Sequence, residues 1–139
     1  MIILGFDTVL YRGPAGETAD TAVENVKDVT VNMESGEADV TTRKTNGWRA
    51  YVGTLKEASV EFQILYDTED EDFQAFHNAY FTNTPIALFI SDGHGNGLDA
   101  DFSITSFSLE QPLEEAVKVN ITAKPTASTR APIWKEATA

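Results

Sequence analysis

The chain has 139 residues, about the size of one folded domain, and its 42% hydrophobic content is typical of a globular protein. It contains no cysteine, which excludes disulfides and thiolate metal sites, and it has no apolar run long enough for a membrane-spanning helix. With 22 acidic and 10 basic residues the net charge is −12, which disfavours specific binding to DNA and to anionic membranes.

The first six residues are apolar, and Asp7 follows them at once. They lack the basic region and the small-residue cleavage site of a signal peptide, so we expect a strand here and a protein that stays in the cytoplasm where it is made. Residues 13–20 place Gly13, Pro14 and Gly16 among small polar side chains, which predicts a flexible loop.

Four segments alternate apolar and polar side chains, the pattern of strands that cover a core with one face. They are residues 28–33, 58–64, 100–104 and 117–123. Residues 85–90 are apolar on both faces, which predicts a central strand, or one covered on its second face by a helix or a partner subunit. The patterns together predict a mainly β fold, an antiparallel β-sandwich or barrel.

A hairpin is predicted where residues 40–43 and 48–52 flank Asn46 and Gly47, because both residues tolerate the positive φ of a type I′ turn. Arg43, Lys44 and Arg49 gather near this turn. They are three of only ten basic residues in the chain.

One helix is predicted over residues 69–82, flanking the sheet. Thr68 is a candidate N-cap, with Glu71 three residues later as in a capping box. Asn83 and Pro85 are expected to end the helix. Its apolar stripe consists of Phe73, Phe76, His77 and Tyr80.

The glycine-rich residues 91–97 do not predict a phosphate-binding loop, because a strand pattern follows them instead of a helix. Asp92, Asn96, Asp99 and Asp101 could offer oxygens to Ca²⁺, but the spacing of an EF-hand loop is missing. Asp101 alternates with core residues, so we expect it to face solvent. The simpler interpretation is a hairpin connection.

No catalytic group has a visible partner. His77 lies on the helix stripe, and His94 lies in the glycine-rich loop without a serine nucleophile motif nearby. The carboxylates of residues 69–72 and 114–115 have simpler roles as helix-start and solvated charge than as a glycosidase pair. We therefore expect no enzyme activity, no cofactor and no metal. The aromatics could form a sugar-binding platform or a subunit interface: Tyr11, Trp48, Tyr51, Tyr66 and Trp134.

Read in order, several segments resemble the tail tube (major tail) proteins of siphophages and related prophages. The stretches Asp-Val-Thr-Thr-Arg at residues 39–43, Gly-Trp at 47–48 and Pro-Leu-Glu-Glu-Ala-Val at 112–117 carry most of the likeness, which spans roughly residues 22–134. The other segments are residues 26–31, 54–62 and 100–107.

The resemblance implies one β domain over residues 1–139, and this length leaves no room for an added immunoglobulin-like domain. The Thr, Ser, Pro and Ala content of residues 125–139 predicts a C-terminal arm. It implies hexameric rings stacked into a hollow tube, an architecture that type VI secretion tube proteins share. Implied partners are further copies of the chain, the tape measure and the tail terminator, with DNA only as passing, non-specific cargo and no membrane. The implied location is the virion tail, after synthesis in the host cytoplasm.

Candidate contacts between subunits are Arg43, Lys44, Trp48, Arg49 and Trp134. The acidic composition predicts a tube wall that repels phosphate, so that DNA slides without sticking. Other functions stay open: an acidic β-sandwich that binds a glycan or a protein, a type VI or contractile-injection tube subunit, an acidic DNA mimic and, last, an enzyme.

Overall fold

The computed structural model describes residues 2–126, 128 and 130–136. It contains one α-helix, α1 (Glu71–Thr82), and two 3-10 turns, Gly5–Asp7 and Arg43–Thr45. The strands are β1 (Val9–Pro14), β2 (Thr21–Ala22), β3 (Val26–Asp39), β4 (Tyr51–Leu65), β5 (Ile86–Ser91), β6 (Gly97–Glu110), β7 (Lys118–Pro125) and β8 (Ile133–Lys135). No helix in the described part is long and apolar enough to cross a membrane.

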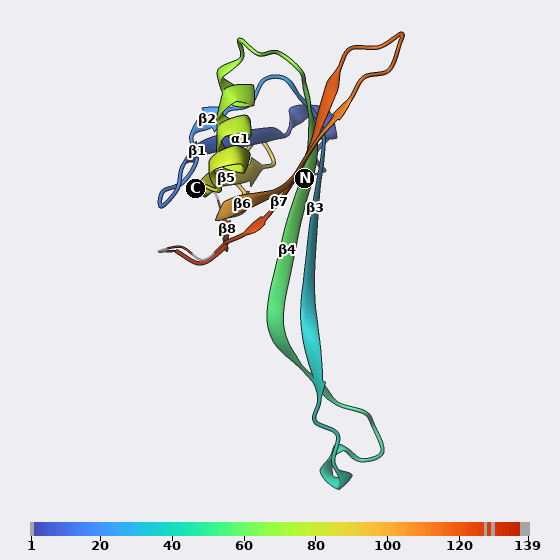
Figure 1. The fold of residues 1–139 in the computed structure, drawn as a ribbon. Helices are drawn as coiled ribbons and strands as arrows, with labels where there is room; N and C mark the ends of the chain where they lie inside the picture. The colour runs from blue at the N-terminus through green and yellow to red at the C-terminus, as the bar shows by residue number, and fades with distance from the viewer. Residues whose placement is uncertain (1, 127, 129, 137–139) are drawn as a thin grey trace.

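The strands form one antiparallel sheet in the order β2-β1-β5-β6-β7-β4-β3, and β8 pairs with the first residues of β6. Strand β6 is shared: its first half pairs with β5 and β8, and its second half pairs with β7. The sheet curls, α1 lies against it, and the β3–β4 hairpin projects far below the rest of the molecule (Figure 1). The predicted mainly β fold with one flanking helix is confirmed.

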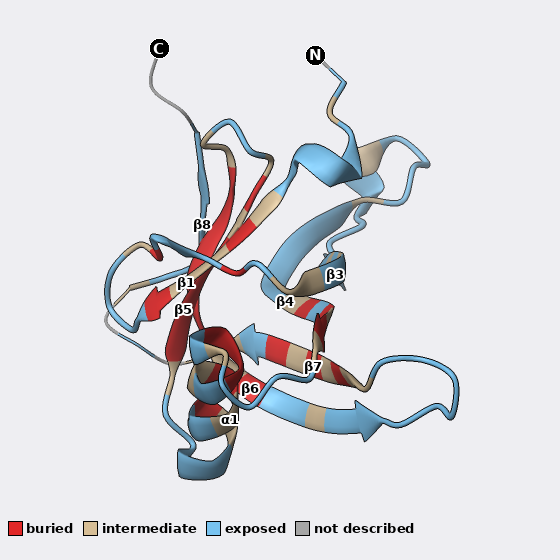
Figure 2. Ribbon diagram, turned by 90° about the horizontal axis from the view of Figure 1, so that it is seen from above, coloured by how far each residue is buried: buried red, intermediate tan, exposed pale blue. Residues whose placement is uncertain are grey.

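The main core lies between α1 and the inner face of the curled sheet, where buried residues concentrate on β5, β6, β7 and the helix (Figure 2). Val60, Phe62 and Ile64 of β4 face inward, as their alternation predicts, and each is at most 2% exposed. The helix contributes Phe76, which packs on Phe62 with ring centroids 5.1 Å apart.

Helix α1 begins at Glu71 with Asp70 as its N-cap, where the Asp70 carboxylate accepts a hydrogen bond from the Asp72 amide. The predicted cap at Thr68 is therefore wrong. Thr68 lies before the turn, and its carbonyl instead accepts the side-chain amide of Gln74. Aspartate is as good an N-cap as threonine, so composition alone could not choose between them. The predicted end is confirmed by the left-handed conformation of Asn83.

Strand β5 is central, as predicted, and it is buried on both faces. Ile86 and Leu88 join the main core, whereas Ala87 and Phe89 form a second cluster with Ala19. The loop between β1 and β2 thus covers the second face of β5 from within the same chain, and Tyr11 of β1 stacks on Phe89.

The N-terminal segment does not form the predicted strand. It has no partner in the sheet, since β1 begins at Val9, and residues 5–7 form a 3-10 turn closed by the Thr8 amide on the Gly5 carbonyl. Three of its apolar side chains stay in solvent: Ile2 is 96% exposed, Leu4 67% and Phe6 96%.

The hairpin turn is longer than predicted, because β3 ends at Asp39 and β4 begins at Tyr51. Asn46 and Gly47 do adopt positive φ, at 55° and 81°. They follow a 3-10 turn, however, and do not make a two-residue connection by themselves. Threonine side chains hold the longer loop: the Thr42 hydroxyl accepts from the Lys44 amide, and the Thr45 hydroxyl lies 2.6 Å from the Thr42 carbonyl.

Candidate functional site: exposed surfaces of the sheet

The projecting part of the β3–β4 hairpin is a two-stranded ribbon with solvent on both faces. Its pairs run from Met33 with Ala58 to Asp39 with Tyr51, interrupted by an irregularity beside Gly36. A Cβ at Gly36 would lie 2.5 Å from the Thr54 hydroxyl, so glycine permits the close approach of the two strands there. Because a two-stranded ribbon buries little, these residues add little to the core.

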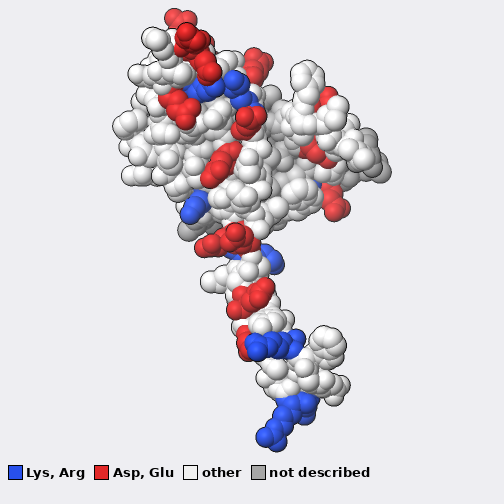
Figure 3. Space-filling model, turned by 90° about the vertical axis from the view of Figure 1, so that its right-hand side faces the viewer, with Lys and Arg blue, Asp and Glu red and all other residues white. Residues whose placement is uncertain are grey.

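The loop at the end of the ribbon carries four of the five predicted contact residues: Arg43, Lys44, Trp48 and Arg49. All four are exposed, and Trp48 has 78% of its surface in solvent. Figure 3 shows basic side chains at the far end of the hairpin, while acidic side chains dominate the opposite end of the molecule. None of these cations forms an ion pair with any residue that the structure describes.

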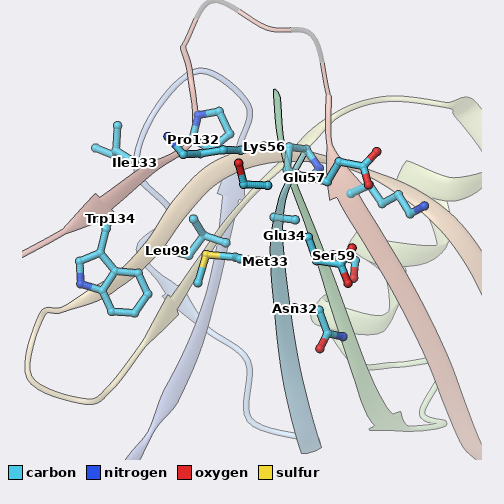
Figure 4. Close-up of a pocket in the computed structure, with 14 residues that line it drawn as sticks. Asn32, Met33, Glu34, Lys56, Glu57, Ser59, Leu98, Pro132, Ile133 and Trp134 are labelled. Carbon is cyan, nitrogen blue, oxygen red and sulfur yellow. The ribbon is translucent and has the colours of Figure 1, made fainter. Parts of the chain in front are cut away.

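Trp134, the fifth predicted contact residue, lies apart from the others on β8. It lines a groove of about 700 Å³ together with Met33, Lys56, Leu98 and Ile133 (Figure 4). The groove exists because β7 pairs with β4 only as far as the Val60–Ala123 pair, after which the two strands separate. Trp134 and Met33 remain more than half exposed there.

A second surface is the polar face of the sheet that turns away from the core. Direct pairing aligns Thr30, Glu61, Thr122 and Ser106 across the four strands β3, β4, β7 and β6. The next row contains Gln63, Asn120 and Ser108. These two rows and the neighbouring residues on the same side of the sheet form a surface that we call the polar face. Its charged members, by strand alternation, are Asp28, Glu34, Glu57, Glu61, Glu110, Lys118 and Lys124.

Asp101 does not face solvent as predicted; it is 2% exposed, and Asp99 beside it on β6 is 1% exposed. Arg130 from the C-terminal tail bridges the two carboxylates, with nitrogen–oxygen distances of 2.7 Å to Asp99 and 2.9 Å to Asp101. Two groups of the β1–β2 loop complete the cluster: the Gly16 amide donates to Asp101 and the Thr18 hydroxyl to Asp99.

Burial alone would raise the pKa of Asp101, but hydrogen bonds from Arg130, Gly16 and Ser128 outweigh that effect and hold the pKa below its ordinary value. Burial alone would lower the pKa of Arg130, but hydrogen bonds and charge attraction from Asp99 and Asp101 raise it above its ordinary value. The cluster is therefore a fixed ion network that fastens the β1–β2 loop and the tail to β6. The sequence does indicate that Asp99 and Asp101 share one face of a strand, because they are two residues apart. Nothing in the sequence pairs them with Arg130.

The four side chains that could offer oxygens to Ca²⁺ do not converge on one point. Asp92 accepts from the amides of His94 and Asn96 within the β5–β6 loop, whereas Asp99 and Asp101 bind Arg130. Among the described residues no cluster of three or more His, Cys, Asp or Glu could hold a metal ion. Residues 91–97 form the expected hairpin connection between β5 and β6.

The aromatic side chains also do not form one platform. Tyr11 stacks on Phe89 and Tyr66 packs edge-on against Phe73, whereas Trp48 and Trp134 lie on separate elements. His77 is half-buried on α1 among phenylalanine rings, with Phe81 at 4.6 Å and Phe107 at 6.0 Å between centroids. The contacts of His77 are those of a packed side chain.

A model of the phage tail tube protein family matches residues 3–127 of the chain. Two solved structures from gene transfer agent particles superpose with TM-scores of 0.72, one from a native virion at 13% identity and one from the tail of an empty particle with C6 symmetry at 17%. Each alignment covers 96% of this chain and 98% of the other.

The SPP1 tail tube, solved by solid-state NMR and cryo EM, superposes with a TM-score of 0.72 at 16% identity, over 98% of this chain and 80% of that chain. At such identities these likenesses establish a common fold. A search of curated protein sequences finds no match.

Proposed function

The chain belongs to the phage tail tube protein family, and from this premise we propose that its copies form hexameric rings that stack into a hollow conduit for DNA. As a member of that family it is a structural, non-enzymatic component of the virion tail. The C6 symmetry of the similar gene transfer agent tail supports six copies per ring. Contacts within such a ring are head-to-tail and close on themselves when the rotation is right.

The observation that carries this proposal is the polar face, which we assign to the wall of the conduit. A lumen wall must stay wet and must not hold the DNA that passes. Hydroxyl and amide side chains dominate the rows from Thr30 to Ser106, and carboxylates outnumber lysines among the charged members. Such a wall repels phosphates and releases few counterions, so DNA would not adhere to it.

The basic end of the β3–β4 hairpin would then contact an adjacent subunit or ring. Arg43, Lys44 and Arg49 are unpaired within the described chain, and Trp48 offers the large exposed aromatic surface that anchors many interfaces. Acidic surface is plentiful on a neighbour of net charge −12. Tape measure and tail terminator proteins are proposed as further partners, inside the tube and at its end.

Electron microscopy of the purified protein, with a tail initiator added if needed, tests the proposal. We expect tubes with six subunits per ring, and we expect the lumen of a reconstructed tube to be polar and net acidic. A strict monomer under all seeding conditions, or a lumen lined by basic residues, would contradict the proposed conduit.

The hairpin contact has its own test, the charge reversal Lys44→Glu compared with Lys27→Glu, which makes the same charge change at an exposed position on the body. We expect Lys44→Glu to lower the tube yield while the monomer keeps its thermal stability. Equal yields from both variants would remove the hairpin end from the contact.

A further inference from the structure

The groove beside Trp134 is an open end of the apolar core. Leu98 is 5% exposed at its floor, while Met33 and Trp134 are 55% and 59% exposed around it. Figure 4 shows the Met33 and Trp134 side chains directed into the same space. Apolar side chains in a concave site of this volume are typical of surfaces that receive another group.

Of the charged side chains that line the groove, Glu34, Glu57 and Lys124 belong to the polar face, whereas Lys56 lies on the Met33 side of the hairpin. Lys56 pairs with Ser35 and so shares a face with Met33 and Ala58. In Figure 4 it extends toward Pro132 and Ile133, whereas Glu57 points away from Trp134. Lys56 forms no ion pair with any residue that the structure describes. An occupant with an apolar side chain next to a carboxylate would therefore match it.

Such a segment exists at the opposite end of the molecule, in the connection between β6 and β7. Leu113 at its tip is 100% exposed and Leu109 is 46% exposed. Glu114 follows Leu113 and, unlike Glu115 with its contact to Lys118, forms no ion pair among the residues described. This tip, residues 109–115, projects upward in Figure 1, away from the downward β3–β4 hairpin.

Strand β6 separates the groove from the tip. It begins next to Trp134, which pairs with Leu98, and it ends at Glu110, within the tip. At about 3.3 Å per residue, the eleven steps from Leu98 to Leu109 span roughly 36 Å, so the tip cannot enter the groove of its own chain. A donor and a receiver at opposite ends of one subunit give a heterologous contact, which continues as an open stack when the rotation between copies does not close a ring.

We propose that the tip, residues 109–115, of one copy docks in the groove of a second copy, with Leu113 on Met33, Leu98 and Trp134 and with Glu114 near Lys56. This contact rests on the proposed function in one respect, that copies stack along the tube axis. The exposed N-terminal segment around Phe6 is the other apolar candidate within the chain, and Asp7 gives it a carboxylate as well. Its backbone lies against Gly93 in the loop before β6, at the same end of β6 as the groove, whereas the tip lies at the opposite end.

Thiol cross-linking tests the contact, because the natural chain has no cysteine. Gln111→Cys places one thiol in the tip and Ser35→Cys places one in the groove lining, while Leu113, Met33 and Trp134 stay in place. In tubes verified by electron microscopy, a short bismaleimide should link the double variant into a ladder of multimers. Each single variant has one thiol per copy and should therefore give no product larger than a dimer.

A second pair, Gly5→Cys with Ser35→Cys, distinguishes the N-terminal segment as occupant; a Cβ at Gly5 meets nothing within 4 Å. A ladder from this pair and none from the first, or intact tubes that give no ladder with either, overturns the docking proposal while leaving the tube intact. Failure of the natural chain to form any tube would instead count against the proposed function. A ladder without tubes would support the docking contact alone.

A charge exchange supplies the energetic test. Lys56→Glu and Glu114→Lys should each lower the tube yield about tenfold, and the double variant should recover most of it, since it restores the opposite charges. Thermal unfolding of the monomers should be unchanged, because both residues are exposed there. If the losses of tube yield in the two single variants simply add in the double variant, Lys56 and Glu114 do not pair.

Discussion

Strand β4 runs through two regions that differ in almost every physical respect. Inside the body, Val60, Phe62 and Ile64 are buried against α1 and β7. In the projecting hairpin the same strand places Leu55 84% in solvent, and the adjoining loop leaves Trp48 78% exposed. The body thus holds the fold together by burial, whereas the hairpin keeps large side chains available. Changes in the two regions should separate stability from assembly.

The largest effect is expected from Phe76→Ala in the body. Phe76 is fully buried against Phe62, so its removal leaves a cavity and should lower the free energy of unfolding by about 3–5 kcal/mol. Trp48→Ala in the hairpin is the matched control and should change stability by less than about 0.5 kcal/mol. Chemical denaturation of the two monomers checks the difference. Similar losses would mean that the hairpin belongs to the cooperative core.

Arg130→Ala should come next, since it strips the partner from two buried carboxylates in the body. The expected loss is about 3 kcal/mol, because Asp99 and Asp101 would be left charged and largely dehydrated. Trp134 fluorescence should report release of the tail, measured in a Trp48→Phe background so that one indole remains. An unchanged emission spectrum and midpoint would show that the tail is held by β8 pairing alone.

Acid should release the same tail in the natural chain. The pKa of Asp101 lies below its ordinary value of 3.8, so the carboxylate stabilises the folded state fully above that pH. This contribution is lost as the pH falls below about 4 and through the folded-state pKa. Trp134 emission titrated downward from pH 7 should shift only in that acidic range. The Asp101→Asn variant should have a lower free energy of unfolding at neutral pH, and its Trp134 emission should lack this shift in the acidic range.

The smallest effect is expected in the hairpin loop, from Gly47→Ala. Gly47 has φ of 81° with open space around it, so the substitution costs conformational strain of about 1 kcal/mol without any clash. Gly5→Ala, also in open space but without positive φ, is the control. Because the loop lies outside the core, we expect global unfolding to be nearly unaffected and amide exchange in residues 42–49 to quicken. A shifted global midpoint would contradict this separation.

Sequence patterns located the helix and the core strands because alternation and helical spacing are local consequences of burial, as in Val60, Phe62 and Ile64. They failed where the partner is distant. Asp101 alternates with core residues in the same way as a solvent-facing residue would. Only the fold brings Arg130 and the Gly16 amide to its carboxylate. The 3-10 turn at Arg43–Thr45 depends on the Thr42 and Thr45 hydroxyls, which compete with the Asn46-Gly47 preference for a tight turn.

Of the predicted contact residues, the four near Asn46 and Gly47 are close in sequence and therefore share a loop. Trp134 shares only its residue type with Trp48, and the structure places it in the groove, apart from that loop. The groove could not be predicted, since it arises from the separation of β4 and β7 after the Val60–Ala123 pair. Whether any of the five contacts another subunit stays a prediction.

In the free subunit, the local stability of the projecting hairpin should decrease with distance from the body. Beyond Val60 its backbone hydrogen bonds belong to two strands only, with water on both faces. Local opening should therefore become cheaper from the body toward Arg43, and amide protons should exchange in a graded series along β3 and β4. Packing against a neighbour would slow exchange along the whole hairpin and remove that gradient. The extent of slowing along one hairpin would therefore measure how much of it contacts a neighbouring subunit in a growing polymer.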